Sequence, residues 1–308
     1  MTEKSASGIE QQQDLHDASR PADDATRMSD EPIRRPSSGK KLDPRGTPAF
    51  RFFKNVVFYP ILTRLWRPEI LGLENVPAGG AILAANHLDA GDALALPGTL
   101  PMAIVMPAKK ELFEGKSIGG RIVGWFLRIT GQAPIDRAGG DTGKSNLASV
   151  QDFLDVGGYT GIFPEGTRSP DGRLYRGHTG VARLALSTGK PVVPIGFFNS
   201  RLQRNRLGLK IAMRDLRIVI GEPLDFADRS AGIDDIKVLR QTTNEVMAAI
   251  QQITGQEYVD VYASKVKRGE LSKAQADEFV LASPLDAVMS PPTIPSPQAA
   301  SEQEQPAS

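Results

Sequence analysis

Cysteine is absent from this chain of 308 residues. Disulfide bonds, thiolate metal sites and cysteine nucleophiles are therefore excluded. The sequence also lacks an excess of charge of one sign, because 37 lysines and arginines balance 36 aspartates and glutamates. General nucleic-acid binders usually carry a clear basic surplus, so this balance argues against nucleic acid as a partner.

Long apolar runs are missing as well. A helix needs about 20 consecutive apolar residues to cross a bilayer, and no stretch of the sequence approaches that length. The polar start MTEKSASGIEQQQD differs from a secretory signal peptide, so we expect no such leader. Apolar residues nevertheless make up 40% of the chain, which is enough to form a core in its middle part.

Both ends of the sequence are polar. Residues 1–47 are rich in Ser, Asp, Arg, Pro and Gln, and residues 283–308 are dominated by Pro and Ser. Segments of this composition bury too little apolar surface to offset the entropy lost on ordering. We therefore expect two disordered tails, with one folded domain at 68–282 preceded by a helical segment at 48–67.

The segment FRFFKNVVFYPILTRLW, residues 50–66, is the most aromatic part of the chain. Its apolar residues with helical spacing are Phe50, Phe53, Val57, Ile61 and Leu65. Pro60 is expected to kink the helix, and five basic residues but no acidic one occur from Arg45 to Arg67. Two interpretations remain open: a terminal helix packed on the core, or an amphipathic interfacial helix with basic side chains toward anionic lipid head groups.

The middle of the chain alternates short apolar runs with helical patterns. The predicted strands lie at 80–86, 102–107, 132–136, 160–164, 190–198 and 216–224. The predicted helices lie at 116–130, 141–156, 179–189 and 234–255, the last of them closed by Gly255. Such alternation predicts an α/β fold with a mixed, largely parallel central sheet covered by helices. In such sheets a ligand lies beyond the strand ends, in the loops that lead to helices.

The loop NHLDAGD, residues 86–92, follows a buried run and leads into a predicted helix that begins at Asp92. The turn can bring the carboxylate of Asp92 back to His87, which fixes the tautomer of the imidazole and leaves its other nitrogen free to accept a proton. Histidine is the natural base for a hydroxyl group near neutral pH. The alternative is purely local: Asp92 caps the helix, and Asp89 forms the turn with Gly91.

Histidine is scarce, with three residues in the whole chain. His16 lies in the expected N-terminal tail. A histidine mechanism must therefore use His87 or His178. His178 precedes a helix in RGHTG, where a solvated loop residue is the commoner case.

Two further polar loops follow predicted strands. FPEGTRSPDGR, residues 163–173, holds Arg168 beside hydroxyl groups, and PIDRAGG, residues 134–140, holds Arg137. The planar guanidinium group suits phosphate, and the cluster EGTRS is too polar for us to expect it in a buried position. The alternative for 163–173 is an ordinary surface loop with an Asp-Gly turn. We expect all three loops to open on the same side of the sheet.

Four blocks occur in a fixed order, NHLDAGD (86–92), PIDR (134–137), FPEGTRS (163–169) and VVPIG (192–196). In this order and spacing they resemble the blocks of the glycerolipid acyltransferase family, most closely those of bacterial 1-acylglycerol-3-phosphate acyltransferases. The resemblance covers about residues 68–225. Asp89 stands where the family usually has serine, and Pro134 stands where a bulky apolar residue is common.

The resemblance implies a role for each matched residue. His87 is the general base and Asp92 is its orienting partner, while Arg168 and Arg137 hold the phosphate of the acceptor. It assigns Glu165, Gly166 and Thr167 to the glycerol site. It assigns Pro194 to the path of the acyl chain.

The family implies transfer of a fatty acyl group to the sn-2 hydroxyl of 1-acylglycerol-3-phosphate (lysophosphatidate), giving phosphatidate for phospholipid biosynthesis. The donor is acyl-CoA or acyl carrier protein, and glycerol-3-phosphate or another lysophospholipid is the alternative acceptor. No cofactor or metal is expected. Because the sequence has no cysteine and no G-x-S-x-G elbow, direct transfer is favoured over an acyl-enzyme. The lipid acceptor implies a cytoplasmic protein, peripheral on the inner face of the cell membrane and held there through residues 50–66.

The stretch AGGDTGKS, residues 138–145, nearly spells a phosphate-binding P-loop. That motif requires a glycine, four residues and then Gly-Lys-Ser/Thr, but Ala138 stands where the first glycine is needed. We expect a glycine-rich turn in which Asp141 caps the next helix. A nucleotide-binding, P-loop-like protein remains the alternative from a different class.

Overall fold

The computed structural model describes residues 43, 48–109, 121, 133–135, 148–204 and 210–287. The chain divides into two compact units, Met1–Lys41 and Leu42–Ser308, and every described helix and strand belongs to the second. Nearly all of the predicted tail at 1–47 and of the predicted helix at 116–130 lies outside the described residues.

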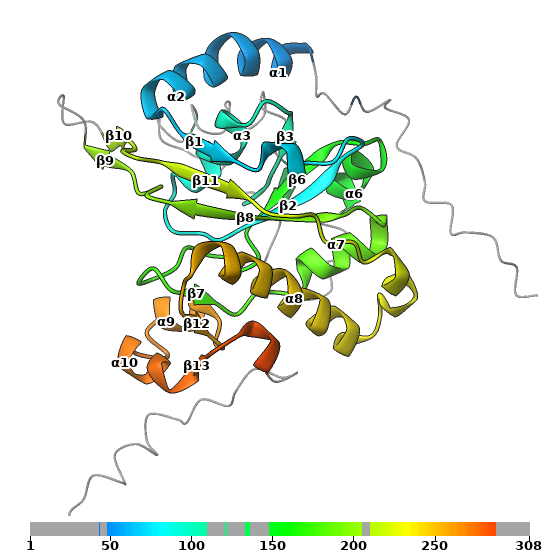
Figure 1. Ribbon diagram of the computed structural model, residues 1–308, viewed down its shortest axis with the longest axis vertical. Coiled ribbons are helices and arrows are strands. Elements are labelled where there is room, and N and C mark those ends of the chain that lie inside the picture. The colour runs from blue at the N-terminus through cyan, green and yellow to red at the C-terminus, as the bar shows by residue number, and fades with distance from the viewer. Residues whose placement is uncertain are drawn as a thin grey trace, which may run out of the picture. The chain divides into compact units, whose positions relative to one another are not determined.

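A six-stranded sheet forms the centre of the second unit (Figure 1). In spatial order its strands are β1 (Glu69–Leu71), β11 (Arg217–Ile220), β8 (Val192–Phe198), β2 (Ala81–Ala85), β6 (Tyr159–Ile162) and β3 (Ile104–Val105). Four of the five neighbouring pairs are parallel, and only β11 and β8 run antiparallel. The predicted fold class, a mixed and largely parallel sheet, is confirmed. The three-residue strand β1 is not predicted, because so short a run carries no periodic signal.

Strand β2 lies in the middle of this sheet, between β6 and β8. All five of its residues are buried, because both faces of the sheet are covered. Leu83 stands opposite Gly161 on one side and Val193 on the other. The three parallel strands therefore end at the same edge, and the loops that follow β2 and β6 begin there.

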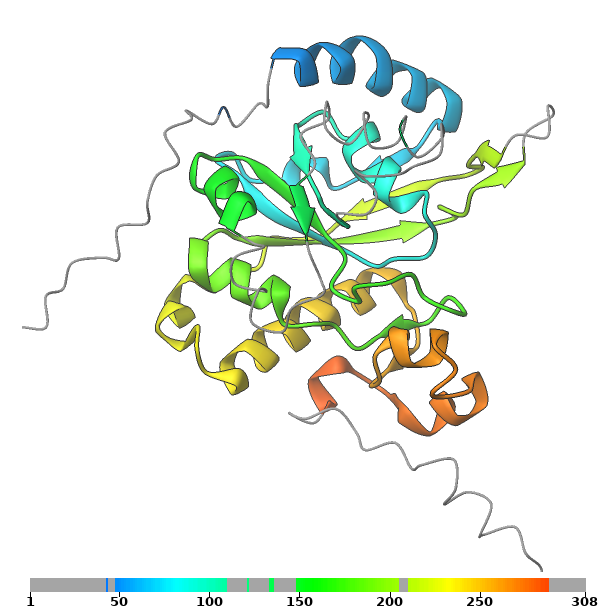
Figure 2. The same ribbon diagram turned by 180° about the vertical axis from the view of Figure 1, so that it is seen from behind.

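Helices cover the two faces of the sheet, as Figures 1 and 2 show from opposite sides. One face carries α1 (Pro48–Phe52), η1 (Phe53–Phe58), α2 (Tyr59–Trp66) and α3 (Asp92–Thr99). The other face carries α6 (Ala148–Asp155), α7 (Gly180–Thr188) and α8 (Ile236–Thr254). Successive strand residues point to opposite faces of the sheet. Leu83 packs in the core under α2 and α3, and Ile82 packs in the core under α6, α7 and α8.

The first helical stretch contains a wide turn. Residues Phe53–Phe58 form a π-helical segment between α1 and α2, and the N–H of Tyr59 bonds to the carbonyl of Lys54, five residues back. Pro60 follows directly and has no N–H to give to the preceding turn. Insertions of this kind turn the residues after them relative to those before. The kink expected at Pro60 thus takes the form of a widened turn ahead of it.

The wide turn changes which apolar side chains face the solvent. Four large ones point away from the protein, with exposed fractions of 58, 58, 55 and 46%: Phe52, Val56, Ile61 and Leu65. Phe50 is only 4% exposed and packs inward. The predicted single stripe from Phe50 to Leu65 is therefore wrong, because regular helical spacing does not allow for the extra residue in the turn.

Lys54 ties this helical stretch to α3. Its ammonium group is buried and donates to the carbonyl oxygens of Pro97, at 2.7 Å, and Leu100, at 2.8 Å. These carbonyls lie at the C-terminal end of α3, where a positive charge is favourable. Burial lowers the pKa of Lys54 to about 8. The helix that begins at Asp92 is thereby tied to the helix that exposes the apolar side chains.

The helix predicted at 234–255 is confirmed as α8. The carboxylate of Asp235 accepts the N–H of Lys237 at 2.7 Å and caps the first turn. Gly255 ends the helix in the left-handed conformation, with φ of 65°. The predicted helix at 179–189 is likewise present as α7.

Residues 256–287 form a small C-terminal lobe beside the strand β7 (Leu174–Tyr175). Its elements are β12 (Tyr258–Val259), α9 (Ala263–Lys267), α10 (Lys273–Ala276), η5 (Asp277–Phe279), β13 (Val280–Leu281) and η6 (Pro284–Asp286). Strands β13, β12 and β7 make a second sheet with its own apolar core. Ala287 packs into the core under α8, so packed structure continues beyond the boundary predicted at 282.

Smaller elements complete the described chain. They are η2 (Leu73–Asn75), β4 (Pro107–Lys109), β5 (Ala133–Ile135), β9 (Gln203–Arg204), β10 (Lys210–Ala212) and η4 (Ala227–Gly232). Strands β4 and β5 pair in parallel, and β9 and β10 pair antiparallel. Among the residues that the structure describes, no helix is both long enough and apolar enough to cross a membrane.

Candidate active site

His87 and Asp92 lie in contact at the carboxyl end of β2. The Nδ1 atom of His87 is 2.9 Å from an Oδ atom of Asp92. Since a carboxylate only accepts, Nδ1 carries the hydrogen, and the neutral ring keeps its lone pair on Nε2. The juxtaposition expected from the spacing is present, with the basic nitrogen on the side of the ring away from the carboxylate.

The loop between the two residues holds Asp92 in place. Its Oδ2 atom also accepts the N–H groups of Leu88, at 2.5 Å, and Asp89, at 2.9 Å. Asp92 is the first residue of α3, its side chain is fully buried, and Gly91 occupies the capping position. Asp92 therefore does more than cap a helix, because one carboxylate oxygen gathers three donors of the same loop.

The ring of His87 is fixed from a second direction by Phe163, the first residue after β6. The two rings stack with their centroids 4.0 Å apart and an interplanar angle of 11°. The side chain of His87 keeps 14% of its surface exposed. The imidazole is thus held in one orientation and still reaches the surface.

Glu165 lies beneath the site. It is 1% exposed, and its two oxygens accept the backbone N–H of His87, at 2.9 Å, and of Tyr175, at 3.0 Å. Burial raises the pKa of Glu165 to about 8, against the opposite effects of the two N–H groups and of Lys267. The expectation that the EGTRS turn is too polar to be buried is wrong for this residue, because backbone donors satisfy its carboxylate.

Arg168 lies beside the histidine loop. The N–H of the next residue, Ser169, bonds to the carbonyl of His87 at 2.7 Å and joins the two loops. The guanidinium of Arg168 is 52% exposed and has its Nη1 atom 3.7 Å from Oδ1 of Asp89. Asp89, the departure from the family pattern, therefore places a carboxylate against the arginine that the sequence assigns to phosphate.

Gly166 and Thr167 complete the turn. Gly166 has φ of +70°, and an added Cβ would come within 2.8 Å of the ring of His178, so the position requires glycine. The ring of His178 stacks on Tyr262 of the C-terminal lobe at 4.4 Å. The hydroxyl of Thr167 accepts the Nζ of Lys267, from the same lobe, at 3.2 Å. The lobe thus contacts the turn directly at Thr167 and also contacts His178, which lies against Gly166.

The remaining predicted site residues are Arg137 and Pro194. Arg137 lies outside the described residues, as does the P-loop-like stretch at 138–145. Pro194 stands inside β8 opposite Ala84, and its ring flanks Gly221 under α8. In the described structure Pro194 contributes to the packing of the sheet, on the face opposite to α2 and α3.

Asn86 was missed by the sequence analysis. Its Oδ1 atom accepts the N–H of Phe197 at 2.7 Å, and its Nδ2 atom donates to the carbonyl of Phe197 and to Gln256. The side chain thus continues the pairing of β2 with β8 past the end of the strand. Its place just before His87 was the only available signal, since its partners are more than a hundred residues away.

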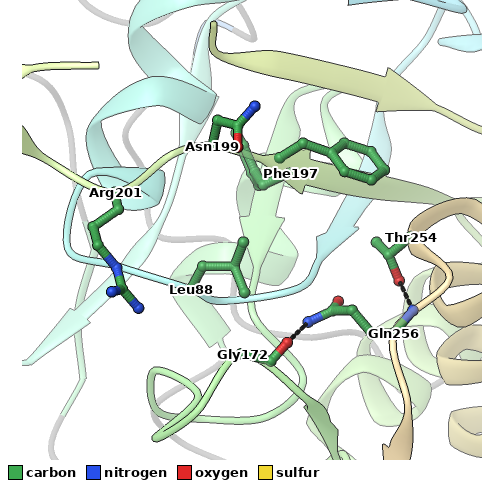
Figure 3. Close-up of a pocket in the computed structure, with 8 residues that line it drawn as sticks. Leu88, Gly172, Phe197, Asn199, Arg201, Thr254 and Gln256 are labelled. Atoms are coloured by element: carbon green, nitrogen blue, oxygen red, sulfur yellow. Dashed lines mark hydrogen bonds between the residues drawn. The ribbon is translucent and has the colours of Figure 1, made fainter. Parts of the chain in front are cut away.

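A pocket of about 250 Å³ opens beside the histidine loop (Figure 3). Its lining residues are Leu88, Gly172, Phe197, Phe198, Asn199, Arg201, Thr254 and Gln256. Gln256 closes one side through a hydrogen bond from its amide to the carbonyl of Gly172. Apolar side chains, amides and one guanidinium suit a ligand that is part apolar and part anionic. Within the described ranges, no group of three or more His, Asp or Glu side chains gathers that could hold a metal ion.

Comparison with known proteins follows the same blocks. A family model described as acyltransferase matches residues 67–197, which include His87, Asp92 and Arg168. The 1-acyl-sn-glycerol-3-phosphate acyltransferase of Bacillus subtilis is 34% identical over 164 residues, which cover 52% of this chain and 75% of that protein. The chain belongs to the acyltransferase family. The resemblance drawn from the sequence is confirmed, and the protein is an acyltransferase.

Two further proteins are similar to this acyltransferase. The 1-acyl-sn-glycerol-3-phosphate acyltransferase of Pseudomonas aeruginosa is 33% identical over 131 residues, covering 42% of this chain and 48% of that protein. The crystal structure of the 1-acyl-sn-glycerophosphate (LPA) acyltransferase from Thermotoga maritima is 24% identical, with a TM-score of 0.48, covering 66% of this chain and 78% of that one. The C-terminal lobe lies beyond the residues that the family model matches.

Proposed function

We propose that this acyltransferase moves a fatty acyl group from acyl-CoA or acyl carrier protein to the sn-2 hydroxyl of lysophosphatidate, giving phosphatidate. The observation that carries the proposal is the His87–Asp92 contact of 2.9 Å, joined directly to the loop of Arg168 by the bond from Ser169 to His87. The names of the relatives from Bacillus subtilis and Pseudomonas aeruginosa support the choice of acceptor.

In this proposal His87 acts as the general base. Its Nε2 atom takes the proton of the sn-2 hydroxyl as the oxygen attacks the thioester carbonyl. The tetrahedral intermediate then collapses, the carbon–sulfur bond breaks, and the leaving thiolate takes the proton from the imidazolium. Asp92 holds the ring in the tautomer that has its lone pair on Nε2, and it stabilises the imidazolium while the proton is on the ring.

Arg168 binds the phosphate of the acceptor in this proposal. Its guanidinium is half exposed on the loop that adjoins His87, and a planar fork of donors matches two phosphate oxygens. Arg137 keeps its predicted role as a second phosphate ligand. Glu165 acts as a positioning residue, because both of its oxygens hold backbone N–H groups, one of them that of His87.

The membrane surface is the proposed place of this reaction. The stretch from α1 to α2 exposes four large apolar side chains, and α3 adds Leu94, which is 40% exposed. Arg64 and Arg67 are exposed at the end of α2. Helices with apolar side chains outward and basic ones beside them lie in the head-group region of anionic bilayers. This arrangement supports peripheral binding on the inner face of the cell membrane, where the lipid acceptor lies.

An acyl-transfer assay tests the proposed function. Purified protein is incubated with oleoyl-CoA and one acceptor at a time: lysophosphatidate, glycerol-3-phosphate or lysophosphatidylcholine. Lipid mass spectrometry should find phosphatidate with lysophosphatidate and little product with the other two. The Arg168→Ala variant should raise the KM for lysophosphatidate. Rapid acylation of glycerol-3-phosphate or lysophosphatidylcholine, with none of lysophosphatidate, would overturn the proposed acceptor.

A further inference from the structure

Lys267 is the last residue of α9, in the C-terminal lobe. Its ammonium donates to the hydroxyl of Thr167 at 3.2 Å, and Thr167 stands immediately before Arg168 in the FPEGTRS turn. We propose that Lys267 is a second cation that binds the phosphate of the acceptor together with Arg168. The inference rests on the proposed function and extends it to a residue outside the part that the family model matches.

The charges around the turn give the first reason. A phosphate monoester carries about −1.5 to −2 charges near pH 7. Arg168 has the carboxylate of Asp89 at 3.7 Å, so part of its positive field is already offset. A single half-neutralised guanidinium balances such a ligand poorly. Lys267 contacts a residue of the same turn, and as a compact point charge it complements the planar fork of the arginine.

The lobe that carries Lys267 is anchored beside the turn. Nη1 of Arg176, just after β7, lies 2.6 and 2.8 Å from the two carboxylate oxygens of Asp260, just after β12. Both side chains are buried, and the hydroxyl of Tyr258 donates to the same carboxylate at 3.1 Å. Arg240 of α8 donates to the carbonyl of Gly177 at 2.8 Å and holds the adjoining backbone. The lobe is therefore fastened to the strand that follows the turn.

A second contact holds the start of α9 against His178, which lies beside the turn. Tyr262 directly precedes α9 and stacks on His178 with an interplanar angle of 8°. His178 in turn leaves room only for glycine at Gly166, and its N–H bonds to the carbonyl of Pro164 at 2.8 Å. Lys267 reaches Thr167 from a helix that begins against His178, and His178 is itself bonded to Pro164 of the turn. The exposed ammonium thus lies at the residue next to Arg168.

The kinetic test compares two lipid acceptors, lysophosphatidate with a phosphate group and 1-oleoylglycerol without one. The variant Lys267→Met is compared with Lys265→Met, which removes the same charge from the same helix. With lysophosphatidate, Lys267→Met should raise KM roughly fivefold to tenfold and leave kcat nearly unchanged. With 1-oleoylglycerol, which lacks the phosphate, both variants should match the wild type. Lys267→Arg should restore most of the affinity for lysophosphatidate.

A binding measurement judges the inference without any turnover. Glycerol-3-phosphate is titrated into the full-length protein and followed by calorimetry, with wild type, Lys267→Met and Lys265→Met side by side. Only Lys267→Met should weaken the binding of glycerol-3-phosphate, by roughly the fivefold to tenfold expected for KM. If the wild type does not acylate lysophosphatidate and this loss of binding is still seen, the proposed function fails and the phosphate site stands. Unchanged phosphate binding and KM in Lys267→Met would overturn the inference.

Asp89 provides a sharper form of the test. The variant Asp89→Asn keeps the shape of the side chain and removes the charge that faces Arg168. In that background Arg168 has its full positive field, so Lys267→Met should raise the KM for lysophosphatidate less than it does in the wild type. An equal rise in both backgrounds would contradict the sharing of one phosphate by the two cations.

Discussion

The histidine loop at 86–92 and the C-terminal lobe at 256–287 meet the same turn, yet they are built differently. The histidine loop is local, since Asp92 reaches back five residues to His87. The lobe acts over long distances in the chain, with Lys267 meeting Thr167 a hundred residues away. Reactive side chains that follow the end of a strand can be predicted from their spacing in the sequence. Groups that a distant lobe adds can be found only once the lobe is placed.

The first prediction concerns the local half of this comparison and has the largest expected effect. Asp92→Asn keeps the size of the side chain but removes the charge that fixes the tautomer of His87. The kcat for phosphatidate formation should fall by roughly 10²–10⁴. Circular dichroism and urea unfolding check that the fold persists. A loss below about threefold in a folded variant would remove the orienting role of Asp92.

The second prediction breaks the lobe instead. Arg176→Met leaves the buried carboxylate of Asp260 without its main ionic partner, so the free energy of unfolding should fall by about 3–5 kcal/mol. Replacing both residues, Arg176→Met with Asp260→Leu, should recover much of that loss because neither member of the pair is left buried without its partner. Urea denaturation measures both variants. A single variant as stable as the wild type would show that the pair does not anchor the lobe.

The third prediction concerns Glu165, the buried carboxyl group that accepts the N–H of His87 and is influenced by the charge of Lys267 in the lobe. Burial raises its pKa to about 8, above the ordinary value of 4.5. Its contribution to stability is therefore fully present below pH 4.5 and is lost as the pH rises through 8. Between pH 5 and 8 the wild type should lose about 3 kcal/mol more unfolding free energy than Glu165→Gln, whose side chain does not titrate. Parallel curves for the two proteins would place the pKa of Glu165 near its ordinary value.

The fourth prediction has the smallest effect and concerns the outward face of α2. Ile61→Glu and Leu65→Glu should each weaken binding to anionic vesicles by roughly tenfold, because each removes an exposed apolar side chain from the membrane. Leu285→Glu is the control, since Leu285 is equally exposed, at 59%, but lies in the C-terminal lobe. Vesicle co-sedimentation measures all three. Equal losses in the control and the α2 variants would argue against a specific membrane face.

Much of the fold could be predicted because its strands are continuous apolar runs. β2 and β8 are buried on both faces, and short apolar runs such as AILAA, bounded by turn residues, are typical of such strands. The wide turn before Pro60 could not be predicted from regular helical spacing. One extra residue in this turn changes which side chains of the helix face the solvent. The short strands of the lobe carried no periodic signal, although they position Lys267.

The candidate site was predictable where polarity marks a strand end and unpredictable where polar groups are buried. His87, Asp92 and Arg168 stand out as polar residues after apolar runs. The sequence predicts a solvated turn for Glu165. In the structure its carboxyl group is buried, and it accepts hydrogen bonds from backbone N–H groups of two segments. Asn86 contacts Phe197 and Gln256, which are distant in the chain, and no sequence pattern links them to it.

The measurement that tests the central claim most directly is the single-turnover rate of phosphatidate formation by His87→Ala, with saturating lysophosphatidate and oleoyl-CoA. If His87 is the base, the rate should fall by at least about 10² while the protein remains folded and still binds glycerol-3-phosphate. A folded variant that forms phosphatidate at close to the wild-type rate would contradict the assignment of His87 and the mechanism built on it.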